Sequence, residues 1–370
     1  MVGRPLINYL PNELLAKIFD MGARLPFPVD ERYPHRPLFS KIPIGALYAT
    51  AISQVCIRWR EIIFQMPVVW SFIHLTRTLE THRRLKSDLG RSIDWLPVYL
   101  RRSRNFPLHI TLDTTRVPAD AALALINPYS TRWSTFTLLV SHVGSLPPVL
   151  PLLVRTRVPR LQYLSISSDI YREGIVCYDP LVPFFVTGTP ELATISLSGV
   201  YVAWNALPLS NLRNLELHFT SRWPNFAHLQ DMFDASPMLE RLIIHDDIAS
   251  ILRHVQQPFS MPTVTLGRLK YLEIEAFRIR DEPADVAGLL GLFSMDILES
   301  LMIREITVDE WVSIIAVYDL PVFAFPGFGR ATRTRGRLPN RRLTKSFPFL
   351  QNLVVTAASI MPRSPTSPIR

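Results

Sequence analysis

A six-residue frame, apolar-x-x-apolar-x-apolar, recurs along this chain and limits what it can fold into. The chain of 370 residues holds one weaker early copy and seven clear ones, which begin at Trp133, Leu161, Leu192, Leu212, Leu239, Leu269, Leu298 and Leu350. Five of the seven gaps between these starts are 27 to 31 residues long, and the last gap of 52 residues is close to two periods. Such a period indicates a stack of repeated structural units, one of them degenerate near 311–340.

Each frame predicts a short strand. Apolar residues two apart face the same side of a strand, and the leucine three residues earlier packs the turn that leads into it. One unit cannot bury that face alone, whereas stacked units bury it continuously. The linkers 226–233 and 286–293 have helical spacing. We therefore expect an α/β fold, an irregular solenoid with parallel strands on its concave face and helices or loops on its convex face.

The residues that alternate with the buried ones are expected to line the concave face. They mix charges of both signs with aromatic side chains, as protein-recognition surfaces often do. The candidates are Tyr163, Ser165, Asn214, Glu216, His218, Arg241, His245, Tyr271, Glu273, Glu275, Met302 and Arg304. For any one of them, a solvated position with no partner is the alternative. For the face as a whole, we expect binding of a target protein.

The N-terminal segment predicts two amphipathic helices. Residues 10–21 read LPNELLAKIFDM, in which Pro11 suits the first helical position and Met21–Gly22 ends the helix. Its apolar stripe is formed by Leu14, Leu15, Ile18 and Phe19. A second stretch, 52–64, also has helical spacing and is followed by QMPVVWSFI.

The order of these motifs resembles the F-box family. The resemblance covers residues 10–73, which read Leu-Pro-x-Glu-Leu-Leu-x-x-Ile-Phe, then Val-Cys-x-x-Trp-Arg-x-Ile, then Pro-x-x-Trp. A proline-rich loop is predicted over 23–50. Ile57 stands where the family usually has Arg or Lys. The frames resemble leucine-rich repeats in their longer form, without the family's Asn or Cys after each strand. The combination is similar to F-box proteins with C-terminal leucine-rich repeats, a type common in basidiomycete fungi.

The resemblance implies a partner and a site. An F-box has three helices that dock on the Skp-type adaptor of a cullin-RING ubiquitin ligase, so the resemblance implies a three-helix module here and repeats that hold the ligase's target protein. The family's adaptor-contacting positions correspond to Leu10, Pro11, Leu14, Leu15, Ile18, Val55, Cys56 and Trp59. The alternative is that these residues pack against 90–112 within the chain itself.

The expected domains are an F-box-like module over 5–75, a lead-in over 76–125, repeats over 126–360 and a disordered tail over 361–370. The lead-in holds a predicted helix at 93–100 and a predicted strand at 106–112. The apolar run 311–328 is interrupted by Asp319, Pro321 and Pro326, so we expect a buried strand and turn there and no membrane span.

Charge is concentrated in one segment. The net charge is +9, and seven Arg and Lys residues lie within 330–345, so the rest of the chain is close to neutral. That segment is interpreted first as an unstructured insertion. A nuclear-import signal, or contact with an acidic partner or nucleic acid, is the alternative, and the last would suit a repeat scaffold that works without a ligase.

Signatures of catalysis are missing from the sequence. It contains no Gly-x-Ser-x-Gly elbow, Walker loop or His-Glu-x-x-His, Gly327-Phe-Gly329 lacks the third glycine of a dinucleotide site, and His245-Asp246-Asp247 is interpreted as a polar loop. We therefore expect no enzyme activity, catalytic residue, metal or cofactor. Two cysteines and no apolar signal core predict the cytoplasm or nucleus.

Overall fold

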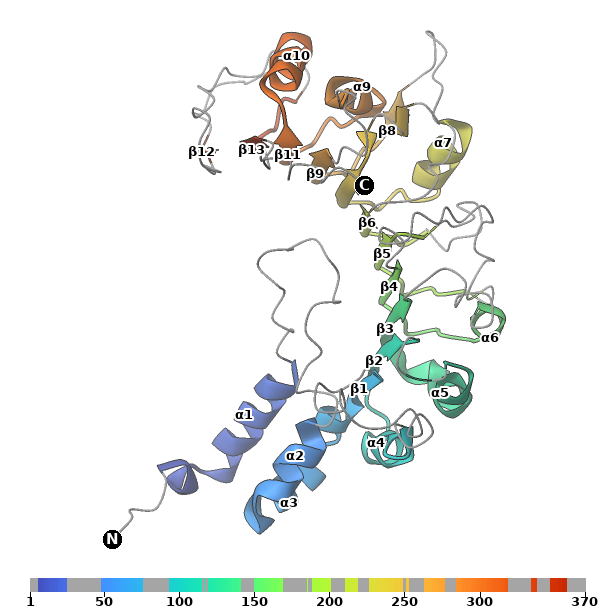
Figure 1. Cartoon of the computed structure of the whole chain (residues 1–370), viewed down its shortest axis with the longest axis vertical. Coiled ribbons are helices and arrows are strands. Elements are labelled where there is room, and N and C mark those ends of the chain that lie inside the picture. Colours follow the sequence, from blue (N-terminus) through green and yellow to red (C-terminus); the bar gives the residue numbers. More distant parts are fainter. Residues whose placement is uncertain are drawn as a thin grey trace, which may run out of the picture. The chain divides into compact units, whose positions relative to one another are not determined.

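Parallel β-strands with helices along one side make up both units of this chain, as a computed structural model shows (Figure 1). The units are Met1–Pro208 and Leu209–Arg370. The structure describes residues 6–24, 48–75, 93–114, 117, 119–140, 150–168, 185, 188–200, 210–218, 226–248, 251–252, 263–276, 284–318, 334–337 and 347–357.

The first unit begins with helices. They are η1 (Leu6–Tyr9), α1 (Asn12–Arg24), α2 (Tyr48–Val55), α3 (Ile57–Phe64) and η3 (Pro67–Ser71). The prediction of one helix over 52–64 is wrong, because Cys56 is extended, with φ −159° and ψ 169°, and separates α2 from α3. The prediction that α1 ends at Met21–Gly22 is also wrong. A Cβ on Gly22 would lie 2.0 Å from Tyr48 Oη, so glycine there leaves room for the Tyr48 side chain of α2.

The sheet of the first unit contains β1 (Phe72–Leu75), β2 (Leu108–Asp113), β3 (Trp133–Val140), β4 (Tyr163–Ser168) and β5 (Thr194–Ser198), parallel and adjacent in chain order. Between the strands lie α4 (Leu96–Arg102), α5 (Ala119–Ile126), η6 (Asn127–Arg132) and α6 (Leu150–Val154). Figure 1 shows α5 and α6 on the same side of these strands. Because β1 pairs with β2, the predicted module 5–75 and the lead-in share one sheet.

The second unit repeats this arrangement. Its parallel strands are β6 (Asn214–His218), β7 (Arg241–Asp246), β9 (Tyr271–Ala276), β11 (Ser300–Ile306) and β13 (Asn352–Ala357). The helices α7 (Phe226–Asp234), α9 (Val286–Gly291) and α10 (Val308–Tyr318) lie along one side of the strands (Figure 1). A separate parallel pair joins β8 (Val264–Thr265) to β10 (Phe293–Ser294).

The predicted strands are confirmed at every frame, and the frame residues form the core. The leading residue of each frame is buried, as are its two later apolar residues in nearly every copy. The leading leucine also closes a turn: Leu161 N–H donates to Val158 O at 3.2 Å, and Leu239 N–H donates to Ser236 O at 3.1 Å. The same turn precedes Leu192, Leu269, Leu298 and Leu350.

Neighbouring repeats of the second unit are joined by backbone bonds just before each strand. The N–H groups of Glu240 and Arg241 both donate to Arg213 O, at 2.9 Å each. The pattern recurs with Lys270 and Tyr271 on Glu240 O, Glu299 and Ser300 on Lys270 O, and Gln351 and Asn352 on Glu299 O. These bonds hold the strands in register without any side chain.

The region predicted as a buried strand and turn begins as a helix. Residues 311–318 belong to α10, because Thr307 and Glu310 form a capping box at its start: Thr307 N–H donates to Glu310 Oε2 at 2.7 Å, and Glu310 N–H donates to Thr307 Oγ1 at 3.3 Å. Among the described residues, no helix combines the length and apolar character needed to cross a membrane.

Part of the basic segment is also structured. Residues 334–337 form β12 (Thr334–Arg337), which pairs antiparallel with β13, so the expectation of an unstructured insertion is wrong for these four residues. The predicted loop over 23–50 is wrong at its ends, because residues 23–24 belong to α1 and residues 48–50 belong to α2. Its remaining residues, the rest of 330–345, Gly327-Phe-Gly329 and the predicted tail 361–370 lie outside the described residues.

Candidate functional sites

The first candidate site is an apolar stripe left exposed on α1. Leu14, Ile18 and Met21 are exposed by 48%, 46% and 58% respectively. Their i, i+4, i+7 spacing places them along one side of the helix. On the other side, Leu15 and Phe19 are buried in the helical core. Helix α1 is therefore apolar on two sides, of which the described part of the first unit buries only one.

A second exposed apolar group lies at the corner between α2 and α3. Val55 is 59% exposed and Ile57 is 71% exposed, on either side of the exposed Cys56. The next residue, Arg58, anchors the corner to the start of α1: its Nε donates to Asn12 Oδ1 at 2.8 Å and its Nη2 donates to Leu10 O. The corner thus lies beside the first turn of α1.

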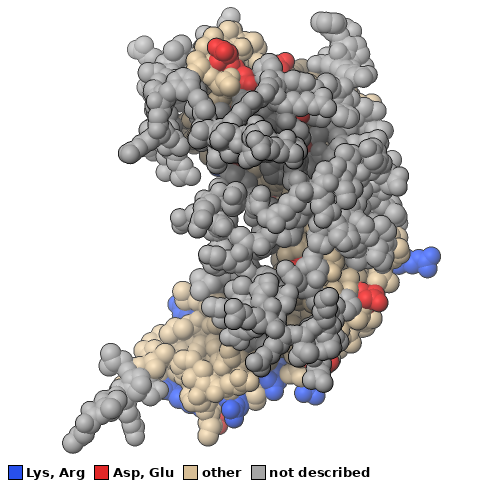
Figure 2. Space-filling view, viewed as in Figure 1, with Lys and Arg blue, Asp and Glu red and all other residues tan. Residues whose placement is uncertain are grey.

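Together, Leu14, Ile18, Met21, Val55 and Ile57 form what we call the apolar helical face. The space-filling view shows the region of α1–α3 as mostly uncharged, with basic residues towards its margins (Figure 2). Several exposed apolar side chains within one short helical module mark a binding site more often than a neutral surface.

Of the predicted adaptor-binding residues, five are exposed: Pro11, Leu14, Ile18, Val55 and Cys56. Leu10 is half-buried, and so is Trp59, whose ring centroid lies 5.0 Å from that of Phe19. Leu15 is fully buried, so its placement on a contact surface is corrected: it packs in the core. Sequence reasoning missed Met21, although it continues the i, i+4, i+7 spacing, and Ile57, which was noted only as a departure from the family.

Residues 90–112 do pack on the helices, but at other positions. In α4, Tyr99 packs edge-on against Trp70 with ring centroids 5.0 Å apart, and Arg102 lies 3.9 Å above the Phe64 ring and 4.4 Å above that of Trp70. The hydroxyl of Tyr99 also accepts from Thr50 N–H at 3.3 Å. These contacts leave the apolar helical face exposed, so packing against α4 does not account for it.

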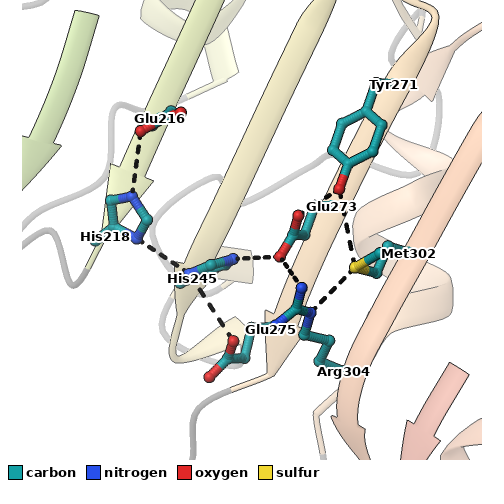
Figure 3. Close-up of polar contacts among 8 residues, drawn as sticks. All are labelled: Glu216, His218, His245, Tyr271, Glu273, Glu275, Met302 and Arg304. Carbon is teal, nitrogen blue, oxygen red and sulfur yellow. Dashed lines mark hydrogen bonds and ion pairs between the residues drawn. The ribbon is translucent and has the colours of Figure 1, made fainter. Parts of the chain in front are cut away.

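The second candidate site lies on the sheet of the second unit, on the face that alternates with its core. Eight side chains there form what we call the polar network (Figure 3): Glu216, His218, His245, Tyr271, Glu273, Glu275, Met302 and Arg304. The register places His218, His245, Glu275 and Arg304 in one row across four strands. All eight were among the predicted concave-face residues.

Glu273 is the centre of this network. Its Oε2 accepts from the Tyr271 hydroxyl at 2.5 Å, and its Oε1 lies 3.2 Å from His245 Nε2 and 3.1 Å from Arg304 Nη2. Burial alone would raise the pKa of Glu273, but bonds from His245 and Tyr271 and the charge of Arg304 lower it to about 2. Burial and the bond to Glu273 raise the pKa of Tyr271 to about 12. Glu273 is therefore an anion at neutral pH.

Two imidazoles extend the network to β6. His218 Nδ1 lies 3.1 Å from His245 Nδ1, and burial lowers the pKa of His245. Glu275 Oε2 lies 3.9 Å from His245 Nδ1, and burial raises the pKa of Glu275 to about 7. The guanidinium of Arg241 stacks on the Tyr271 ring at 4.2 Å and brings a positive charge to the same face.

The structure separates the predicted target-binding residues into two groups. Asn214, Glu216, Arg241, Tyr271 and Arg304 are half-exposed and can contact a partner. His218, His245 and Glu273 are buried, with only 3% of His245 exposed, so their assignment as contact residues is corrected: they position their neighbours.

Two further predictions concern Tyr163 as a contact residue and the interpretation of His245-Asp246-Asp247. Tyr163 is half-exposed and lies on β4 of the first unit, outside the network. The interpretation of His245-Asp246-Asp247 as a polar loop is wrong, because His245 and Asp246 are the last residues of β7 and all three residues are buried. The Asp247 N–H donates to Asp246 Oδ1 at 2.7 Å. Across the described residues, no group of three or more His, Cys, Asp and Glu could hold a metal ion.

Comparison with known proteins adds no assignment: no family model matches the chain, and no curated protein matches it.

Proposed function

We propose that this protein is the substrate-recognition subunit of a Skp–cullin–F-box type ubiquitin ligase. In this proposal α1, α2 and α3 are the F-box that binds the adaptor, and the parallel strands with their linkers are leucine-rich repeats that bind a target protein. The observation that carries it is the apolar helical face, which lies within the motif that resembles the F-box and which the described chain leaves exposed.

The energetics favour a protein partner for this face. Burying an exposed aliphatic side chain contributes roughly 1.5–3 kcal/mol, so several half-exposed ones supply a large part of a stable interface. Arg58 holds the α2–α3 corner beside the start of α1, which arranges the apolar residues before any partner arrives. Docking by a preformed helical face is a common mode of recognition.

The second part of the proposal concerns the target. The half-exposed residues around the polar network include both charge signs and an aromatic ring under a guanidinium, a composition enriched at protein interfaces. The protein's contribution to ubiquitin transfer would be proximity, because holding the target near the ligase's reactive group raises its effective concentration.

The test is retention of purified chain on an immobilised Skp-type adaptor. We expect a Leu14→Asp, Val55→Asp double variant to lose at least about 90% of the retention, since two buried carboxylates oppose association. Val312→Asp with Val317→Asp on α10 is the matched control, because those valines are exposed to a similar extent. Equal retention of wild type and the Leu14/Val55 variant would show that the docking assignment is wrong.

A further inference from the structure

The hydrogen bonds around His245 allow a single arrangement of protons when both imidazoles are neutral. A carboxylate can only accept, so the 3.2 Å bond to Glu273 Oε1 requires a hydrogen on His245 Nε2. The Nδ1 of a neutral His245 is then an acceptor. The 3.1 Å bond between the two Nδ1 atoms therefore requires His218 Nδ1 to donate. The result is a chain of bonds from His218 through His245 to Glu273 (Figure 3).

We propose that this His218–His245 pair is an acid-responsive latch, which joins β6 to β9 while at least one of the two rings is neutral and opens when both rings carry a proton. A first proton can enter at His218 Nε2, which faces Glu216 Oε2 at 3.9 Å, and it leaves the bond between the rings intact. A second proton, on His245 Nδ1, then faces the His218 N–H across 3.1 Å, where two donors repel. The rings must then separate.

The groups around His245 resist the proton that opens the latch. Around His245, the anion of Glu273 is opposed by Arg304, and burial also disfavours a charged ring. Glu275, beside His245 Nδ1, becomes neutral below about pH 7, so it offers less compensation as the solution becomes more acidic.

The remaining charges on this face lie further along it. Arg241 of β7 stacks on Tyr271 of β9, and Glu305 follows Arg304 on β11 and raises the pKa of Glu275. Since the carboxylate of Glu273 keeps its bonds to Tyr271 and Arg304, β9 and β11 stay joined when the latch opens. The change is therefore confined to the link between β6 and β7.

The latch is tested by long-range ¹H–¹⁵N spectra of the full chain labelled at histidine, titrated from pH 8 to 5. At pH 8 we expect His218 as the Nδ1–H tautomer and His245 as the Nε2–H tautomer, and we expect the bond between the rings to be lost only when both rings carry a proton. Both rings in the same tautomer at pH 8, or an intact bond with both rings charged, would overturn the proposal. A response of the two rings to EDTA or to added zinc would assign the pair to metal binding and overturn it as well.

A pair of variants separates the latch from a general effect on folding. In His218→Phe the donor and the second positive ring are lost, so we expect the midpoint of His245 protonation to rise by about one pH unit. His218→Gln keeps an amide donor and should change the midpoint less. In the control His109→Phe, on β2 of the first unit, the His245 midpoint should not move. If His218→Phe and His109→Phe shift it equally, His218 does not hold the latch.

Discussion

Acidification should destabilise the first unit through His74. This β1 residue is buried, and its Nδ1 lies 3.3 Å from Thr111 Oγ1 on β2. Burial, with a smaller contribution from His109, lowers the pKa of His74 from 6.5 to about 4. The unfolded chain therefore binds the proton more readily than the folded one between these values, and stability falls as pH falls through that window.

The size of the effect follows from the two pKa values. The full shift corresponds to about 3 kcal/mol, of which about 2 kcal/mol is lost between pH 7 and pH 5. The assay is urea unfolding of wild type and His74→Gln, followed by tryptophan fluorescence, at both pH values. Glutamine does not titrate, and it keeps a hydrogen-bonding group near Thr111. The difference between the two proteins cancels other titrating groups, so the same loss of stability in both would refute this reasoning.

Three other substitutions test the packing. Leu272→Ala in the core of the second unit should cost about 3 kcal/mol in urea unfolding and Leu272→Met less than about 1.5 kcal/mol, so equal costs would contradict close packing there. Glu310→Ala leaves one buried and one partly buried backbone N–H group without its acceptor and should lower the unfolding free energy by about 2 kcal/mol, an effect that a surface role would not produce. Arg102→Ala removes the cation over Phe64 and Trp70, for which we expect a loss of about 1 kcal/mol, and Arg102→Lys should recover part of it.

The frames predicted the strands well because each strand is buried on the face that the leucines occupy. A period of two for the apolar residues, together with a buried leucine before them, leaves few other local structures. Where the pattern was ambiguous, prediction failed: the Ile- and Val-rich run after Glu310 suits either a strand or a buried helix. The Thr307-x-x-Glu310 capping box was the signal that could have decided for a helix.

The positions of the candidate-site residues could be predicted from the sequence, but the exposure of each side chain could not. Aligning the frames puts His218, His245 and Glu275 at one frame position, so their common row could be foreseen from the sequence. That His245 is buried and Glu216 half-exposed depends on which neighbours are large, which only the packed sheet decides. Likewise, nothing in the sequence around Cys56 signals the break that exposes Val55 and Ile57.

The backbone bonds before each strand have a consequence for how such a protein can diversify. Carbonyl oxygens such as those of Arg213, Glu240 and Lys270 tie one repeat to the next, and every amino acid has a carbonyl. Substitutions other than proline among the half-exposed residues of the sheet therefore leave these ties in place. Gene copies of this chain could acquire new binding preferences by ordinary point mutation, while inheriting an assembly that needs no compensating change.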